Sequence, residues 1–362
     1  MAEKRAKTTL MIGEEKDRIS KLPDSLIIHI LSFLSTEDVV STCLISKQWK
    51  FMWYYVPNLS FSNSNLANDP KKFYNYVDNY LEHRKRGMYF VPDSAITSFK
   101  LCMDYSYERI NEPHLNKWLA LIVVMKVKEL DLYLKKGKNY HGDMYYYPLP
   151  KTLIVHARYL TILKLNSVEL DSHYSFSFPS LKTLSLSYVR LVVNDVLDNL
   201  LMGSPSLEKL QLYNCCLSND HHDQLLINIQ QSLSLKFLKI SLIKDLVEQI
   251  KVISLESLYL LGVSFDKIEL STCKGIRILQ LTCCWGVEDS SSFENLISNL
   301  PLLEQLTLCN GPKRKLKRVK ISNQHLERLF VINRYEDEMT VIIKSASNLR
   351  IFSCVGNIKF GL

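Results

Sequence analysis

The chain has 362 residues, of which 58 are leucine and only 11 are glycine, and its 45 basic and 37 acidic residues leave a net charge of +8. This composition is typical of a globular chain with a large core and disfavours Gly-rich phosphate-binding folds. The longest apolar run, Trp118–Met125, is too short for a membrane span, which needs about 20 residues. Residues 1–16 show no signal peptide and are expected to be a flexible N-terminus.

Residues 17–57 are predicted to form a small helical unit. Pro23 and Asp24 suit the start of a helix that runs to about Leu34. Ser35 or Thr36 can cap a second helix, and a short third segment carries Trp49.

The first of these helices is more apolar than a surface helix requires. One stripe consists of Leu26, Ile30 and Phe33, and a neighbouring stripe consists of Ile27, Leu31 and Leu34. A unit of this size has little interior of its own. The excess stripe therefore covers either a partner protein or the rest of the same chain, and the pattern leaves both open.

The order and spacing of these residues resemble the plant form of the F-box. The matching segments are Asp17-Arg-Ile-Ser, Leu22-Pro-Asp with Leu26, Ile30–Leu34, and Leu44 with Ser46, Lys47 and Trp49. Ser35 replaces a common proline, and Gln48 and Lys50 replace common arginines. The resemblance implies a three-helix unit that docks on the SKP-type adaptor of a cullin–RING ubiquitin ligase. The residues expected to bind this adaptor by apolar contact are Leu22, Pro23, Leu26, Ile30, Leu31 and Trp49.

Residues 58–95 are expected to be a linker with a helix. The stretch after Pro57 is rich in Asn and Ser and predicts a loop, and 69–81 has helical spacing. A second helix is predicted over 114–125. A Trp-bearing helix in this position resembles the region that precedes the repeats of plant F-box/leucine-rich-repeat proteins.

From residue 96 to 362 the spacing L-x-x-L-x-L recurs, which predicts a leucine-rich-repeat solenoid, a horseshoe of the α/β class. The expected starts are Ile96, Val127, Leu160, Leu181, Leu207, Leu235, Leu255, Ile276, Leu303, Leu326 and Leu349. Their leucines are expected to point inward and the residues between them to line the concave side. Candidate target-binding residues on that side are Lys209, Gln211, Tyr213, Phe237, Lys239, Tyr259, Gln280, Arg328 and Phe330. These could equally be strand residues without a ligand.

Nine scattered cysteines without a C-x-x-C pair indicate a reduced, intracellular chain. Cys215 and Cys284 fall on the repeat register and match no zinc spacing, so they predict core positions, not metal ligands. No cofactor is expected, and no catalytic motif predicts an enzyme.

One basic run accounts for six of the eight surplus positive charges. It contains Lys313, Arg314, Lys315, Lys317, Arg318 and Lys320. The run resembles a nuclear-localisation signal, although a solvated loop or a contact to an acidic partner would give the same pattern. A single basic segment makes nucleic-acid binding a weak alternative.

Together these features resemble the plant F-box/leucine-rich-repeat group, often followed by an FBD module that is not recognised after Leu349. The resemblance implies the substrate-recognition subunit of an SCF-type E3 ubiquitin ligase, located in the nucleus, the cytoplasm or both. The F-box would bind the SKP-type adaptor and the concave face would bind an unknown target protein. The alternative is a repeat scaffold that joins no ligase.

Overall fold

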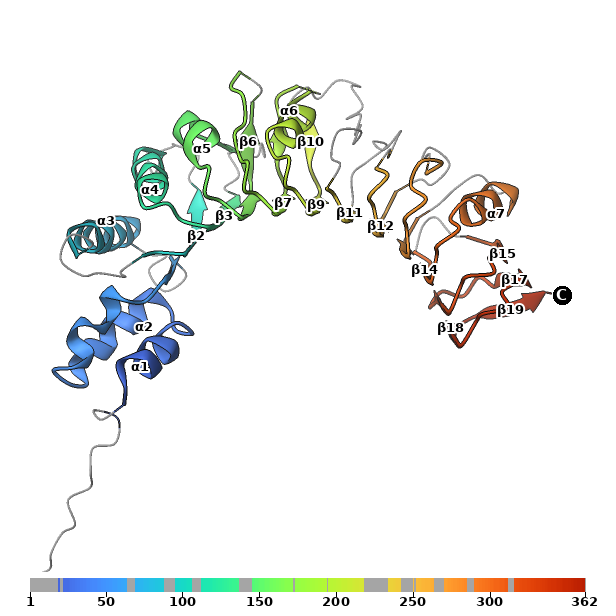
Figure 1. Ribbon diagram of the computed structural model, residues 1–362, viewed down its shortest axis with the longest axis horizontal. Helices are drawn as coiled ribbons and strands as arrows, with labels where there is room; N and C mark the ends of the chain where they lie inside the picture. Colours follow the sequence, from blue (N-terminus) through green and yellow to red (C-terminus); the bar gives the residue numbers. More distant parts are fainter. Residues whose placement is uncertain are drawn as a thin grey trace, which may run out of the picture.

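The computed structural model describes residues 19, 22–63, 69–87, 95–105, 112–136, 145–171, 173–193, 195–217, 234–241, 250, 252–263, 270–284, 290–311 and 316–361. A helical N-terminal unit, residues 22–57, stands at one end of an arc of stacked turns (Figure 1). We call this arc, from Asn58 onward, the solenoid. No helix within the described ranges is both long and apolar enough to cross a bilayer.

The N-terminal unit contains two α-helices, α1 (Asp24–Leu31) and α2 (Thr36–Ser41), and two 3₁₀ segments, η1 (Thr42–Leu44) and η2 (Trp49–Tyr54). The Ser35 side chain caps α2 by accepting a hydrogen bond from the backbone N–H of Asp38 at 3.2 Å. The first helix forms as predicted, but it ends at Leu31 and not near Leu34. The predicted third segment, which carries Trp49, is a 3₁₀ helix. The described residues of this unit thus form two α-helices and two 3₁₀ segments, which does not confirm the three-helix arrangement in detail.

A parallel sheet of twelve strands lines the concave side of the arc (Figure 1). In spatial order its strands are β1 (Asn58–Ser62), β2 (Ser98–Tyr105), β3 (Glu129–Lys136), β5 (Ile162–Asn166), β7 (Thr183–Ser187), β9 (Lys209–Tyr213), β11 (Phe237–Ser241), β12 (Ser257–Leu261), β13 (Ile278–Thr282), β14 (Gln305–Cys309), β16 (Arg328–Asn333) and β18 (Ile351–Gly356). The order follows the sequence, as stacked repeats require.

Each predicted repeat contributes one strand of this sheet, and the strands pair in the predicted register. Leu184 pairs with Leu163 on one side and with Leu210 on the other, and Leu258 pairs in the same way with Leu238 and Leu279. From β2 to β16 the apolar residues of this row are buried. The alternation of buried and partly exposed residues along each strand confirms that the leucines point into the core.

The sheet begins within the segment 58–95 that we expected to be a linker. β1 pairs with β2, with Leu59 opposite Phe99 and Phe61 opposite Leu101. Val56, Leu59 and Phe61 have the spacing of the repeat triplet, but the surrounding Asn and Ser residues led us to predict a loop here. The first strand of the solenoid thus follows the N-terminal unit directly.

Helices and two smaller sheets cover the convex side (Figure 1). The helices are α3 (Pro70–Gly87), α4 (Glu112–Val124), α5 (Lys151–His156), α6 (Val196–Met202) and α7 (Ser290–Ser298). One small sheet contains β4 (Tyr147–Pro148), β6 (Val168–Leu170), β8 (Arg190–Leu191) and β10 (Cys216–Leu217), and the other contains β15 (Arg318–Ser322), β17 (Met339–Ser345) and β19 (Ile358–Gly361). The predicted helices near 69–81 and 114–125 correspond to α3 and α4.

A left-handed residue recurs where the chain leaves the concave sheet. Ser167, Tyr188, Asn214 and Cys283 have φ between 48° and 60°, each seven residues after a repeat start. The N–H of Tyr188 still donates to the carbonyl of Tyr213 in the next turn, at 2.8 Å. This conformation costs L-residues about 1–2 kcal/mol, so the stacking on both sides must hold it in place.

Among the described residues, the last strand of the concave sheet, β18, pairs on one side only, with β16. Phe352 occupies the same row as Leu258 but remains 42% exposed, and it packs edge-on against Phe360 with ring centroids 5.4 Å apart. Inside this turn Gly356 has φ +98°, and a Cβ there would lie 1.8 Å from the carbonyl oxygen of Asn333. Only glycine fits this position.

Two residues of one row allow a matched test of the stack. We expect Leu258→Ala to lower the free energy of unfolding by about 2–5 kcal/mol, because it leaves a cavity between two turns. Phe352→Ala should cost at most about 1.5 kcal/mol, because its ring is only partly buried. Urea unfolding followed by circular dichroism measures both, and equal losses would contradict the proposed packing.

Candidate functional site

The N-terminal unit presents apolar side chains to solvent. We call this set the apolar face; its members are Leu26, Ile30, Phe33, Leu34, Leu44, Ile45 and Phe51, with Phe33 76% and Leu44 92% exposed. Leu26 and Ile30 are four residues apart, so they lie on one side of α1. Isolated exposed apolar residues are ordinary, but seven within such a small unit indicate an interaction surface.

The opposite side of α1 packs into the unit's own core. Ile27 and Leu31 are fully buried there, together with Val39, Trp49, Met52 and Val56. Of the two apolar stripes in the sequence, the structure therefore turns Leu26, Ile30 and Phe33 outward. The other stripe packs against η2 through Ile27 and Leu31.

This arrangement divides the six residues predicted to bind an adaptor. Leu26, Ile30 and Pro23 are exposed and Leu22 is half-buried. Leu31 and Trp49 are 0% and 4% exposed, so in this conformation neither can touch a partner directly. Their burial gives them a different role, which is to hold α1 against η2 beneath the apolar face.

Gln48, one of the departures from the common F-box pattern, ties the start of α1 to the residues before η2. Its amide nitrogen donates to the carbonyl of Leu22 at 3.1 Å and to the carboxylate of Asp24 at 2.6 Å. Ser35, another departure, caps α2 as described above. Both replacements therefore make contacts within the unit.

A buried arginine joins the N-terminal unit to the solenoid. Arg84 of α3 is 1% exposed, and its guanidinium donates to the backbone carbonyls of Trp53, Tyr54 and Val56, at 2.8 Å for Trp53 and 3.0 Å for Val56. These carbonyls lie at the end of η2, where the backbone lacks helical donors. Burial lowers the pKa of Arg84, but the group stays charged because its ordinary pKa is so high.

Further contacts stiffen the same joint. The Trp53 ring lies 5.1 Å from that of Tyr80, and Phe61 of β1 packs edge-on against Tyr80 at 5.4 Å. The backbone N–H of Ser60 donates to the buried hydroxyl of Thr36 at 2.7 Å. Rings, backbone and guanidinium together fix the N-terminal unit against the first turns of the solenoid.

The concave face carries all nine predicted target-binding residues. Each lies on a strand of the twelve-stranded sheet at a position between the buried leucines, and all are at least partly exposed. The structure brings together Lys209, Phe237 and Tyr259: the ammonium of Lys209 lies 4.6 Å from the centroid of the Phe237 ring, which stacks on Tyr259 at 5.0 Å. Arg328 instead forms an ion pair with Glu304 at 3.8 Å.

A residue that the sequence did not single out extends this aromatic surface. Tyr188, at a left-handed position, packs edge-on against Tyr213 with ring centroids 5.1 Å apart. The hydroxyl of Tyr188 donates to that of Tyr213 at 3.5 Å, and this bond raises the pKa of Tyr188. Its place just after the strand, outside the repeat triplet, explains why the spacing gave no signal.

The basic run is only partly within the described residues. Lys313, Arg314 and Lys315 lie outside them, whereas Lys317 and Arg318 are exposed and Lys320 is half-buried. Arg318 and Lys320 belong to β15, whose Val319 and Ile321 are buried. The end of the run is thus a strand of the convex side.

Cys215 and Cys284 occupy core positions, as their register predicted. The thiol of Cys284 donates to the carbonyl of Leu260 at 3.4 Å, and burial raises its pKa to about 11. Across the ranges that the structure covers, no cluster of three or more potential metal ligands is found.

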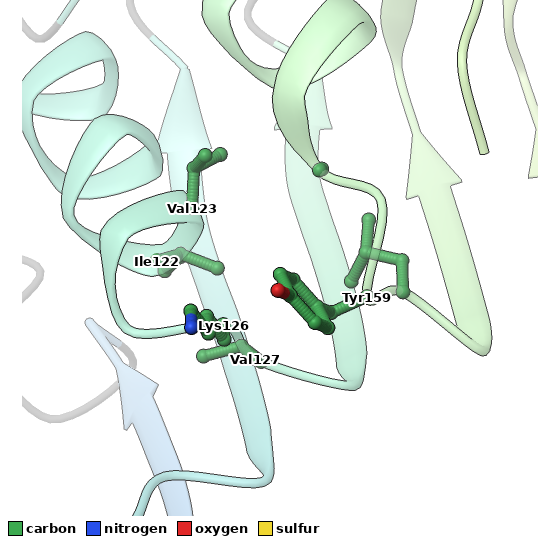
Figure 2. Close-up of a pocket in the computed structure, with 7 residues that line it drawn as sticks. Ile122, Val123, Lys126, Val127 and Tyr159 are labelled. Atoms are coloured by element: carbon green, nitrogen blue, oxygen red, sulfur yellow. The ribbon is translucent and has the colours of Figure 1, made fainter. Parts of the chain in front are cut away.

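Figure 2 shows a small pocket on the solenoid, beside the turns that follow α4 and α5. Its lining includes Ile122, Val127 and Tyr159, and the ammonium of Lys126 lies 5.2 Å from the centroid of the Tyr159 ring. The lining pairs one cation with apolar groups and offers no nucleophile–base pair.

The fold and these surfaces define a class of protein, an F-box unit attached to a leucine-rich-repeat solenoid. The F-box domain model matches residues 19–61, and the model described as "At1g61320/AtMIF1, LRR domain" matches residues 93–309. This second match covers more than half of the chain. The chain belongs to the F-box/leucine-rich-repeat proteins.

Similar proteins come from Arabidopsis thaliana. "Putative F-box/LRR-repeat protein At5g41840" is 29% identical over 234 residues, which are 61% of this chain and 41% of the relative. "Probable FBD-associated F-box protein At1g32375" is 33% identical over 204 residues, 56% of this chain and 46% of the relative. "FBD-associated F-box protein At4g10400" is 28% identical over 348 residues, 92% of this chain and 76% of the relative. The chain spans less than half the length of the first two.

The joint can be tested with Arg84→Met, which keeps the aliphatic length but removes the donors. We expect a loss of about 1–3 kcal/mol, because buried carbonyls of η2 lose their partner. Amide hydrogen exchange should accelerate in η2 and in the last turn of α3. Arg86→Met is the matched control: Arg86 is exposed and pairs only weakly with Glu82 at 3.5 Å. Similar exchange in both variants would show that the guanidinium does not hold the joint.

Proposed function

We propose that this chain is the substrate-recognition subunit of an SCF-type E3 ubiquitin ligase. In this proposal the apolar face of the N-terminal unit binds a SKP-type adaptor and the concave face of the solenoid binds a target protein. The chain itself performs no chemistry. The single observation that carries the proposal is the exposed apolar face on a unit matched by the F-box model.

The energetics support docking at this face. A large apolar side chain contributes about 1.5–3 kcal/mol when it moves from water into a contact. Leu26 and Ile30 are already displayed by α1, and Phe33 follows just after it, while the other side of the helix is fixed by Leu31 and Trp49. Little ordering is needed before binding, so more of this energy is available as affinity.

The joint at Arg84 supports a role in positioning. A ligase subunit that performs no chemistry contributes by holding its target near the thioester of the ubiquitin-charged enzyme. This raises the effective concentration of the target's lysines at that thioester. A fixed joint between the adaptor-binding unit and the target-binding face restricts the volume that a bound target explores. The contacts of Arg84, Tyr80 and Thr36 provide such a restriction.

We further propose that the protein works in a reducing compartment, the cytoplasm, the nucleus or both. All nine cysteines are free, and Cys273 and Cys284 are buried in the core. Import into the nucleus through the basic run remains part of this proposal. Lys317 and Arg318 are its exposed described members.

Adaptor binding is tested by isothermal titration of the full chain with a purified SKP-type adaptor. We expect the double variant Leu26→Asp/Ile30→Asp to bind at least about tenfold more weakly, because two carboxylates would be buried in an apolar contact. Ile253→Asp is the control, since Ile253 is 74% exposed but lies on the solenoid. It should leave the affinity unchanged.

Trp49→Ala distinguishes support from contact. Because Trp49 is buried, we expect this variant to lose both the near-ultraviolet circular dichroism of the N-terminal unit and adaptor binding, whereas Leu26→Asp/Ile30→Asp should keep its fold. Failure of the wild-type chain to bind any adaptor would favour the alternative, a repeat scaffold that joins no ligase.

A further inference from the structure

The central strands of the concave face differ in charge from the first strands. β7, β9, β11, β12, β13 and β14 contain no aspartate or glutamate, but they contain Lys209 and Lys239. Among the first strands, Lys164 of β5 pairs with Asp131 and Lys135 of β3 pairs with Asp104, both at 3.9 Å. Two lysines of the first strands thus have acidic partners on the same face, whereas the six central strands contain no acidic residue that could pair with Lys209 or Lys239.

Lys209 and Lys239 have no carboxylate within ion-pair distance among the described residues. Glu208, the residue next to Lys209 in sequence, immediately precedes β9. Glu208 is engaged by Lys182 at 3.3 Å. Within the part of the chain that the structure describes, both ammonium groups are therefore available to an external anion.

Aromatic residues lie on the strands next to these two lysines. Lys209 lies over Phe237, Phe237 stacks on Tyr259, and Lys239 is the register partner of both Gln211 and Tyr259. Tyr213 and Tyr188 lie at the end of β9 and just after β7. We call Lys209, Lys239, Phe237, Tyr259 and Tyr213 the central patch.

We propose that the central patch binds an extended acidic segment of the target protein, with carboxylates on Lys209 and Lys239 and apolar side chains on the rings. This inference rests on the proposed function and names the chemistry of its target. Charge complementarity selects the occupant: a basic or neutral segment would leave two ammonium groups facing no anion. Rings that are half-exposed and already packed together offer a preorganised contact for apolar residues.

The geometry specifies the spacing of the acidic residues. Lys209 and Lys239 lie on neighbouring strands, about 4.8 Å apart, and are displaced by two residues along them, or about 6.7 Å. Their backbones are therefore about 8 Å apart. In an extended peptide, residues i and i+2 are about 6.7 Å apart, which the flexible lysine side chains can span. A segment with acidic residues two positions apart and an adjacent leucine or phenylalanine fits best.

Fluorescence anisotropy with the full chain tests the proposal. The probe is a fluorescein-labelled peptide with two glutamates at i and i+2 followed by leucine, and its partner peptide has glutamine at both positions. We expect the glutamate peptide to bind at least about tenfold more tightly, with an affinity that falls as salt rises. Equal affinity for the two peptides would overturn the proposal.

Variants locate the contact. Lys209→Met and Lys239→Met should each lower the affinity for the glutamate peptide about tenfold, and Phe237→Ala should lower the affinity for both peptides. Lys164→Met is the matched control, because Lys164 already pairs with Asp131 and lies outside the central patch. If Lys164→Met weakened binding of the glutamate peptide equally, binding would depend on the overall charge of the face and not on the central patch, which would contradict the proposal.

Two further measurements separate the outcomes. If single-stranded RNA of the same charge displaces the glutamate peptide at lower concentration than unlabelled peptide does, the patch is a nucleic-acid surface and the proposal is wrong. Adaptor binding of Lys209→Met/Lys239→Met should equal that of the wild type. A chain that selects the acidic peptide but binds no adaptor would refute the ligase role alone, and the converse would refute the acidic target alone.

Discussion

No turn of this protein can bury its own leucines, and the rest of the structure depends on that constraint. The leucine row of each strand lies against the same row of the next, so register is enforced by the loss of burial that a slip would cause. Leu184 and Leu258 are fully buried for this reason, whereas Phe352, whose strand has one paired neighbour within the described ranges, is not. The left-handed residues after the strands are held in place by the same stack.

Because the inward rows carry the stability, the concave positions between them are free to vary. In this chain they change from paired charges on β3 and β5 to rings and unpaired lysines on β9 and β11. A recognition surface can therefore be altered without disturbing the core beneath it. The N-terminal unit is built in the same way: Leu31 and Trp49 are buried and stabilise the unit, whereas Leu26 and Ile30 are exposed on its apolar face.

The solenoid was largely predictable from sequence, since its signal is a one-dimensional period and each strand contributes the same triplet. The triplet of Val56, Leu59 and Phe61 escaped because its polar neighbours and Pro57 indicated a loop. The site was less predictable. Spacing could identify two apolar stripes on α1, but only the packing of η2 decides that Leu31 is buried and Leu26 exposed. Arg84 was not foreseen, because a basic residue near a helix end ordinarily predicts solvent contact.

The joint at Arg84 has a mechanical consequence. The solenoid is anchored to the N-terminal unit at one end only. A small rotation at this end displaces each strand of the solenoid in proportion to its distance from the joint. The central strands lie several turns away from α3, so any looseness there would be magnified before it reached whatever those strands hold (Figure 1). The guanidinium of Arg84, with three backbone carbonyls as acceptors, makes the connection between the N-terminal unit and the solenoid rigid. Substitutions at the joint should therefore alter the position and orientation of the concave face while leaving both proposed binding surfaces chemically intact.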